Sequence, residues 1–239
     1  MRPDAAIFDM DGLLVDSEPV WHEVEIEVFG RHGVPLTVQR CLETKGMFVG
    51  EAVDHWYARY PWRGASRRAV VAEVVDAMAR RLAEEVELKA GAGHALAFCR
   101  RAGVRLALAS SSPRRLIDVV VDRLGLASSF AVVHSAEDEV AGKPDPAVFL
   151  TTAGLLGVAP GACVVFEDSA AGVLAAKAAG MACVAVPEAP AGDHEPGVLA
   201  ALEQADVVLG SLRDLDDEVW EACAAALEGP GGAGSRGLA

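Results

Sequence analysis

A short apolar run that ends in two carboxylates constrains the fold of this chain more than any other feature. Residues Ala5–Phe8 are apolar without alternation, which is typical of a strand buried on both faces, and Asp9, Asp11 and Gly12 follow directly. In an extended backbone Asp9 and Asp11 point to the same side, and Gly12 lets the chain turn without a side-chain penalty. Two neighbouring carboxylates repel each other, so the pattern indicates a divalent cation as the compensating charge.

Strands and helices alternate along most of the chain. Further apolar runs predict strands at 104–109, 130–133, 163–166, 181–186 and 207–209. Amphipathic patterns with cap-type residues predict helices near 94–101, 113–124, 146–156 and 169–179. Such alternation is typical of parallel crossover units, and it predicts a Rossmann-like α/β fold whose parallel sheet is covered by helices on both faces.

One long helical segment interrupts this alternation. Helical patterns cover 20–31, 36–43, 51–60 and 66–87. We therefore expect an α/β core made of residues 1–16 and 90–226, with a helical cap domain, residues 17–89, inserted after the first strand. The glycine-rich residues 227–239 are expected to form a flexible tail. Asp16 is expected to cap the first inserted helix.

The composition narrows the possible partners and the compartment. A formal net charge of −14 argues against nucleic acid and against membrane surfaces. It leaves a small phosphate ester open, because a metal and a few lysines can bind phosphate on an acidic protein. The five cysteines are scattered without a C-x-x-C pair, which favours free thiols and a cytoplasmic location. We expect no signal peptide and no membrane-spanning helix, and a monomer or a small homo-oligomer.

Polar residues follow several predicted strands at the point where each strand ends. Asp9, Ser110 and Asp168 occupy such positions, Glu167 precedes Asp168, and Lys143 stands before a predicted helix. In open parallel sheets, ligands bind beyond the carboxyl ends of the strands. Taken singly, each motif is explained by a turn, a helix cap or a loop. Their order and placement together favour a functional site.

These residues also carry a family resemblance. The segment Asp9–Asp16, with Ser110, Lys143-Pro144 and the segment Glu167–Ser169, resembles the motifs of the haloacid dehalogenase-like phosphohydrolase superfamily. The resemblance covers nearly the whole chain except the tail, and within the superfamily it is to sugar-phosphate phosphatases with a small helical cap. The stretch 54–62 is similar to the 2-deoxyglucose-6-phosphatase and hexitol phosphatase branch. The family resemblance implies a magnesium-dependent phosphatase that hydrolyses small phosphorylated sugars or polyols through an aspartyl-phosphate.

The resemblance implies a role for each acidic residue. Asp9 is expected to be the nucleophile, and Asp11 the general acid and base. Mg²⁺ is expected to bind Asp9, the backbone carbonyl of Asp11, and Asp168, with Glu167 either as a further ligand or as its support. These four residues are the expected metal site.

The remaining roles concern the phosphate group. Ser110 and Ser111, with the backbone N–H groups that follow, are expected to bind phosphate oxygens at the start of a helix. Lys143 is expected to supply a positive charge to the transferred phosphoryl group.

Two alternatives stay open. The related β-phosphoglucomutases have a histidine where this sequence has Trp21, and a cap arginine shortly after the glycine matching Gly46; residues 47–50 offer none. These departures weaken the phosphomutase hypothesis, and because the hexitol phosphatase branch also has an arginine near Phe48, the preferred sugar stays open. A non-catalytic phosphate-binding module is disfavoured by the complete Asp-x-Asp motif.

The aromatic residues of the helical segment have less definite roles. Trp56 and Trp62 are expected to pack inside the segment. Trp21 and His22 lie about one helical turn beyond the Asp-x-Asp motif and are equally compatible with the mouth of the site or with packing.

Overall fold

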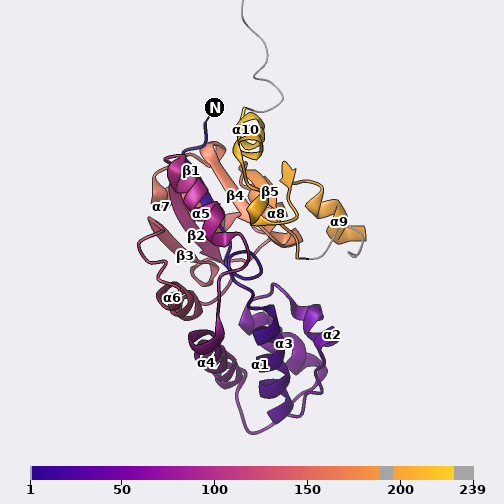
Figure 1. Ribbon diagram of the computed structural model, residues 1–239. Helices are drawn as coiled ribbons and strands as arrows, with labels where there is room; N and C mark the ends of the chain where they lie inside the picture. The colour runs from indigo at the N-terminus through magenta and orange to yellow at the C-terminus, as the bar shows by residue number, and fades with distance from the viewer. Residues whose placement is uncertain (1, 189–195, 229–239) are drawn as a thin grey trace, which may run out of the picture.

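A parallel sheet forms the centre of the computed structural model, which describes residues 2–188 and 196–228. Within these residues six strands are ordered β3-β2-β1-β4-β5-β6, and each neighbouring pair is parallel (Figure 1). The strands are β1 (Ala5–Phe8), β2 (Arg105–Ser110), β3 (Val132–Ser135), β4 (Cys163–Glu167), β5 (Ala182–Ala185) and β6 (Val207–Val208). The predicted α/β fold with a parallel sheet is confirmed.

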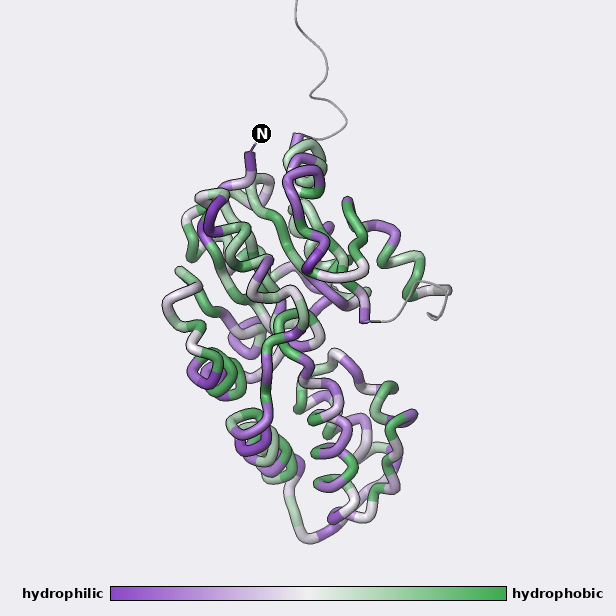
Figure 2. Tube along the Cα trace, in the orientation of Figure 1, coloured by the Kyte–Doolittle hydropathy of each residue, from purple (hydrophilic) through white to green (hydrophobic). Residues whose placement is uncertain are grey.

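Helices cover both faces of this sheet. On one side Ala6 and Phe8 of β1 belong to a buried cluster that includes side chains of α5 (Ala92–Arg101), α6 (Arg114–Arg123) and α10 (Asp217–Ala226). On the other side Ala5 and Ile7 pack with α7 (Ala147–Leu156), α8 (Ala170–Ala178) and α9 (Pro196–Leu202). All of β1 is inaccessible to solvent, which is why its sequence shows no polar alternation. Figure 2 shows the hydrophobic colour along the central strands.

Four helices form a separate group beside the sheet, which we call the helical lobe. They are α1 (Glu18–Arg31), α2 (Val38–Cys41), α3 (Val49–Arg59) and α4 (Arg67–Glu85), and all lie between β1 and β2 in the chain (Figure 1). Trp56 is 0% exposed and Trp62 is 7% exposed inside the lobe, so their predicted packing role is confirmed. The lobe joins the sheet through two linkers, one before α1 and one after α4.

Some local predictions differ from the structure. Strand β3 begins at Val132, two residues later than predicted, and the short helix α9 and the helix α10 were not expected from the sequence. The prediction that Asp16 caps α1 is wrong: Ser17 occupies the N-cap position and Asp16 is exposed. Most of the predicted tail, residues 229–239, lies outside the described residues.

Two expectations from composition can be compared with the structure. All five cysteines are free and buried, as expected for small apolar side chains. In the part of the chain that the structure describes, no helix has both the length and the apolar character needed to cross a bilayer.

Candidate active site

The register of the sheet brings the predicted site residues to one edge. Phe8 of β1 pairs with Phe166 of β4 on one side and with Leu108 of β2 on the other. All three strands run in the same direction, so Asp9, Ser110 and the pair Glu167–Asp168 leave the sheet together. The backbone N–H of Asp9 donates to the carbonyl of Phe166 at 3.1 Å, which extends the pairing of β1 with β4 to Asp9.

Lys143 connects two of these carboxylates. Its Nζ donates to Asp9 Oδ1 and to Glu167 Oε1, both at 2.5 Å. The side chains are 4%, 8% and 0% exposed for Lys143, Asp9 and Glu167, so the ion pairs are shielded from solvent. Charge-assisted hydrogen bonds in such surroundings hold their partners in fixed positions.

The site contains more negative charge than this one lysine can balance. Burial raises the pKa of Asp9, Lys143 lowers it, and the charges of Glu167 and Asp11 add to the rise, so that the pKa is about 8. Burial also raises the pKa of Asp168 well above its ordinary value, with Glu167 and Asp9 adding to the effect. A cation bound here would favour the ionised form of both aspartates.

The donor set fits a hard cation at Asp9 and Asp168. Asp168 is half-buried, and no group of residues 2–188 or 196–228 donates a hydrogen bond to it, so its oxygens are left for another partner. Within the same residues no cluster of three or more acidic, histidine or cysteine side chains forms a complete ligand set. Mg²⁺ does not need one, because it keeps several waters and binds one or two carboxylates plus phosphate oxygens. Asp9, Asp168 and the carbonyl of Asp11 therefore suit magnesium.

Two glycines allow these carboxylates to approach the backbone. A Cβ atom on Gly12, whose φ is +76°, would lie 2.2 Å from Asp168 Oδ2. A Cβ atom on Gly172 would lie 1.9 Å from Glu167 Cδ. Glu167 Oε2 accepts hydrogen bonds from the Ser169 backbone N–H at 3.0 Å and from its hydroxyl at 2.9 Å. Because both Glu167 oxygens are engaged, the geometry favours support of the site over direct metal ligation.

Asp11 is held by hydroxyl groups from two parts of the chain. Ser17 Oγ donates to Asp11 Oδ1 at 2.6 Å, and Ser112 Oγ donates to Oδ2 at 2.7 Å. Ser110 Oγ lies 3.3 Å from the same Oδ2, and the indole N–H of Trp21 donates to Oδ1 at 3.5 Å. Trp21 thus reaches the site. His22 instead lies 3.7 Å from Glu18, a pair one helical turn apart on α1.

Sequence reasoning missed Ser17 and Ser112 as site residues. Both serines stand before a helix, Ser17 before α1 and Ser112 before α6, and nothing in the sequence indicates that they contact Asp11. In the structure Pro113, which has no side-chain cap, occupies the N-cap position of α6. Ser111 is half-buried next to Ser110, and its contact with phosphate stays a prediction.

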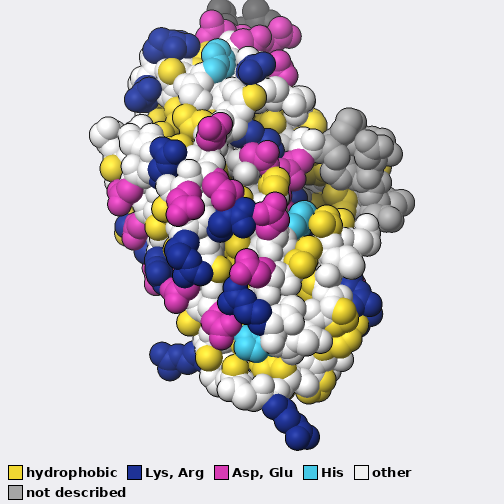
Figure 3. Space-filling model, turned by 60° about the horizontal axis from the view of Figure 1, so that its bottom comes forward, with side chains coloured by type: hydrophobic (Ala, Val, Ile, Leu, Met, Phe, Trp, Pro, Cys, Tyr) yellow, Lys and Arg dark blue, Asp and Glu magenta, His cyan; other side chains and the backbone are white. Residues whose placement is uncertain are grey.

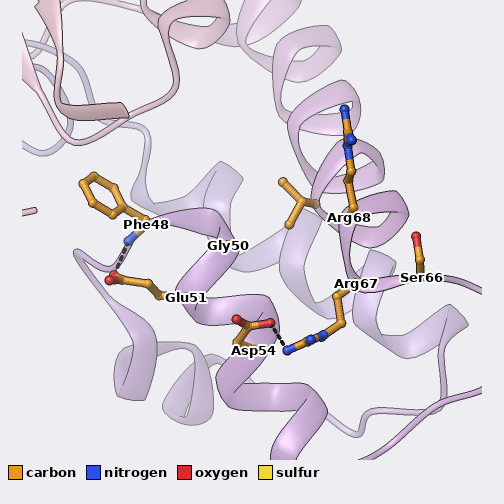
Figure 4. Close-up of a pocket in the computed structure, with 8 residues that line it drawn as sticks. Phe48, Gly50, Glu51, Asp54, Ser66, Arg67 and Arg68 are labelled. Atoms are coloured by element: carbon orange, nitrogen blue, oxygen red, sulfur yellow. Dashed lines mark hydrogen bonds and ion pairs between the residues drawn. The ribbon is translucent and has the colours of Figure 1, made fainter. Parts of the chain in front are cut away.

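A hollow on the lobe is separate from these residues. Figure 4 shows it between α3 and the start of α4, with Arg67 donating to Asp54 at 2.8 Å. Phe48 lines it, but none of the predicted site residues does. Figure 3 shows acidic and basic side chains intermingled over the face of the molecule that it presents, which differs from the continuous basic surface typical of a nucleic-acid interface.

The fold and the site together define an α/β protein whose polar residues gather at the carboxyl edge of a parallel sheet. The haloacid dehalogenase-like hydrolase family model matches residues 3–180. The chain therefore belongs to that family, as its motifs predicted.

Similar proteins include named phosphatases. Hexitol phosphatase B of Escherichia coli (strain K12) is 43% identical over 213 residues, which cover 88% of this chain and 93% of that protein. The phosphorylated carbohydrates phosphatase of Thermotoga maritima is 34% identical over 178 residues, covering 74% of this chain and 82% of that protein. The crystal structure of CbbY from Rhodobacter sphaeroides in complex with phosphate has a TM-score of 0.77 at 25% identity, covering 89% and 96% of the two chains. The predicted enzyme class, a phosphoric monoester hydrolase of this family, is confirmed.

Proposed function

We propose that this protein is a magnesium-dependent phosphatase that hydrolyses small phosphorylated sugars or polyols through an aspartyl-phosphate on Asp9. The observation that carries the proposal is the buried Lys143, bonded at 2.5 Å to both Asp9 and Glu167, beside a carboxylate of Asp168 that accepts no hydrogen bond from the described residues. The names of the two phosphatases described above support a phosphorylated carbohydrate as substrate. Free, buried cysteines support a cytoplasmic location.

The domain division follows from the same proposal. Residues 1–16 and 90–226 supply the catalytic groups, and residues 17–89 form a cap over the carboxyl edge of the sheet. Such a cap excludes bulk water during attack and contacts the part of the substrate that carries no phosphate. Two residues at the start of this cap donate hydrogen bonds to Asp11: Ser17, just before α1, and Trp21, in the first turn of α1.

The reaction has two steps. In the first, an Asp9 carboxylate oxygen attacks phosphorus, the bond between phosphorus and the ester oxygen breaks, and the departing alkoxide takes a proton from Asp11. In the second, water attacks the phosphorus of the aspartyl-phosphate while Asp11 removes a proton from that water. Inorganic phosphate leaves, and Asp9 returns to its carboxylate form.

The other residues act on charge and position. Lys143 fixes Asp9 through the 2.5 Å hydrogen bond and offers positive charge to the transferred phosphoryl group. Ser110 and Ser111 bind phosphate oxygens in this scheme. Asp9, Asp168 and the carbonyl of Asp11 would hold Mg²⁺, which when bound neutralises charge that the nucleophile and the phosphate dianion share.

A screen of phosphorylated sugars and polyols, with phosphate release as the readout, tests the proposal. The wild-type protein with Mg²⁺ is expected to release phosphate, and EDTA is expected to stop the release until Mg²⁺ is restored. The Asp9→Asn variant is expected to lose turnover and phosphoenzyme formation while keeping the wild-type circular dichroism spectrum. Asp122→Asn, on the exposed surface of α6, serves as the matched control. Normal turnover by Asp9→Asn would overturn the assignment.

The same assay separates the phosphomutase and the silent binder. Incubation with a hexose 1-phosphate is expected to give free phosphate, whereas an isomerised hexose phosphate would indicate a mutase. Absence of turnover with p-nitrophenyl phosphate and every sugar phosphate, together with measurable phosphate binding, would indicate a non-catalytic module.

A further inference from the structure

A group of charged side chains outside the catalytic cluster joins the helical lobe to the sheet. Glu188 follows β5, Lys45 lies in the loop between α2 and α3, and Lys89 lies in the linker after α4. Lys45 Nζ donates to Glu188 Oε2 at 2.9 Å, and Lys89 Nζ donates to Glu188 Oε1 at 3.1 Å. Each oxygen of this carboxylate therefore binds one ammonium group.

Lys89 extends this group to the other linker. Its Nζ also donates to the backbone carbonyl of Gly12, which lies in the linker before α1. Lys89 thus connects Glu188 to both linkers between the lobe and the sheet: Lys89 belongs to the linker after α4, and it bonds Gly12 in the linker before α1. Lys45 connects Glu188 to the lobe itself. Lys45 is further anchored within the lobe by Glu18 of α1, with 3.3 Å between Nζ and Oε1.

The group is partly protected from solvent. The side chains of Lys45, Lys89 and Glu188 are 35%, 29% and 29% exposed. Burial raises the pKa of Glu188, but the hydrogen bond from Lys45 and the charges of Lys45 and Lys89 outweigh it, so the pKa lies below its usual value. Glu188 is thus ionised at neutral pH, and both ion pairs are formed. The other ion pair between lobe and sheet helices in the described ranges, Asp76–Arg115, is 48% and 59% exposed and so more screened.

A second contact lies three residues from Lys45 in the same loop. Phe48 packs against the buried cluster on the face of the sheet covered by α7, α8 and α9. A Cβ atom on Gly142 would lie 2.8 Å from Cζ of Phe48. Gly142 precedes Lys143, the residue bonded to Asp9. The loop 45–48 therefore touches the sheet half at an ionic point and at an apolar point, and both are close in sequence or in space to catalytic groups.

We propose that Glu188 is a positioning residue that latches the helical lobe over the catalytic groups by holding Lys45 of the lobe and Lys89 of its linker at once. The proposal rests on the proposed function in one respect, namely that closure of the lobe assists turnover. Loss of the Glu188 charge leaves Lys45 and Lys89 facing the same space as like charges, which favours separation of the lobe from the sheet. Ion pairs of this exposure support a change of about three- to tenfold in the ratio of closed to open molecules.

Distances between spin labels measure this ratio without any substrate. Val38→Cys on α2 and Leu155→Cys on α7 place labels at positions that are 53% and 60% exposed, whereas the native cysteines are buried and react poorly. Pulsed electron paramagnetic resonance is expected to give one dominant distance in the otherwise wild-type protein. Glu188→Gln is expected to add a longer, broader population, and 1 M salt is expected to produce the same change without mutation.

The matched control removes an equal charge far from the lobe. This control is Glu221→Gln. Glu221 is exposed on α10, which lies at the other end of the sheet from the lobe (Figure 1). The substitution is expected to leave the distance distribution unchanged. Identical distributions for wild type, Glu188→Gln and Glu221→Gln at low salt would overturn the latch.

Kinetics supply a second readout that a purely structural role would not give. When the binding-competent state is less populated, the apparent affinity falls by the same factor, whereas saturating substrate restores the closed state. Glu188→Gln is therefore expected to raise KM by the factor by which the closed fraction falls, about twofold if a ratio of ten closed molecules to one open becomes one to one, and to leave kcat unchanged. A fall in kcat with unchanged KM would contradict the latch. If the wild-type protein hydrolyses no phosphate ester while the distances still change, the proposed function fails and the latch stands.

Discussion

Replacement of Lys143 by methionine tests whether one ammonium group holds the carboxylates of Asp9 and Glu167 together. Methionine keeps much of the length and apolar character of the lysine stem but removes the charge. In the structure the Lys143 side chain is 4% exposed and bonds Asp9 and Glu167 at 2.5 Å each. The substitution therefore leaves two buried carboxylates without their shared partner.

The magnitude follows from burial. Removing one partner of a buried ion pair costs about 3–5 kcal/mol in free energy of unfolding, because the remaining charge stays desolvated. The matched control is Lys177→Met: Lys177 donates to Asp206 at 2.6 Å, but the two side chains are 30% and 22% exposed. An ion pair accessible to water contributes about 0.2–1 kcal/mol. We expect the two variants to differ by roughly 2–5 kcal/mol at pH 8.

The difference is expected to depend on pH in one direction. In the folded state the pKa of Asp9 is already raised from 3.8 to about 8, mainly by burial, while Lys143 lowers it. Without Lys143 this pKa rises further. A raised carboxyl pKa means that stability is retained at low pH, where the group is protonated, and is lost as the pH rises from about 4 towards 8. Between about pH 4 and pH 8 Asp9 stays protonated in both folded proteins, so both lose stability equally there. The deficit of Lys143→Met is therefore expected to grow only above about pH 8, where Asp9 ionises in the wild type but not yet in the variant.

Urea unfolding with EDTA present, followed by tryptophan fluorescence at pH 6, pH 8 and pH 9.5, measures these free energies. Lys143→Met is also expected to lose turnover, since Asp9 is no longer held or its charge balanced. A Lys143→Met variant no less stable than Lys177→Met at pH 8, or one with a larger deficit at pH 6 than at pH 9.5, would refute this reasoning.

Two further substitutions test burial at other carboxylates. Burial raises the pKa of Glu25 in α1 from 4.5 to about 7, so ionised Glu25 weakens folding as pH rises through that interval. Glu25→Gln is expected to stabilise the protein by about 1–3 kcal/mol at pH 8 and very little at pH 4.5, measured by urea unfolding, whereas Glu84→Gln on the exposed side of α4 leaves it unchanged. Gly172→Ala is expected to displace Glu167, because the added Cβ would lie 1.9 Å from its Cδ. We expect at least about a tenfold loss of kcat/KM in phosphate release, since misplaced supporting groups cost that much; wild-type activity would contradict the close contact.

Local sequence patterns predicted the main elements because each has a strong local cause. The unbroken apolar run of β1 reflects a strand that is inaccessible on both faces, and the amphipathic stretches of the lobe reflect helices with one buried side. Helix α10 was not predicted, although Asp216 caps it by accepting from the Val219 backbone N–H at 2.9 Å. Few of its side chains are buried, so its apolar pattern is weak.

The candidate site could be predicted only in part. Asp9, Asp168, Lys143 and Ser110 were found because they follow strand ends or stand beside a helix start. Ser112 was not, because nothing in three successive serines distinguishes the one that donates to Asp11 at 2.7 Å.

The sequence by itself determined the order of strands and helices, the inserted helical segment and the chemical types of the residues at the strand ends. Periodicity and residue chemistry encode these locally, so no distant contact is needed to read them. Only the tertiary structure decided that Lys143 and Asp9, 134 positions apart, share a hydrogen bond, and that Glu188 lies between Lys45 and Lys89. Such pairings depend on parallel strand register and on how the lobe meets the sheet, and these are set by packing of the whole chain.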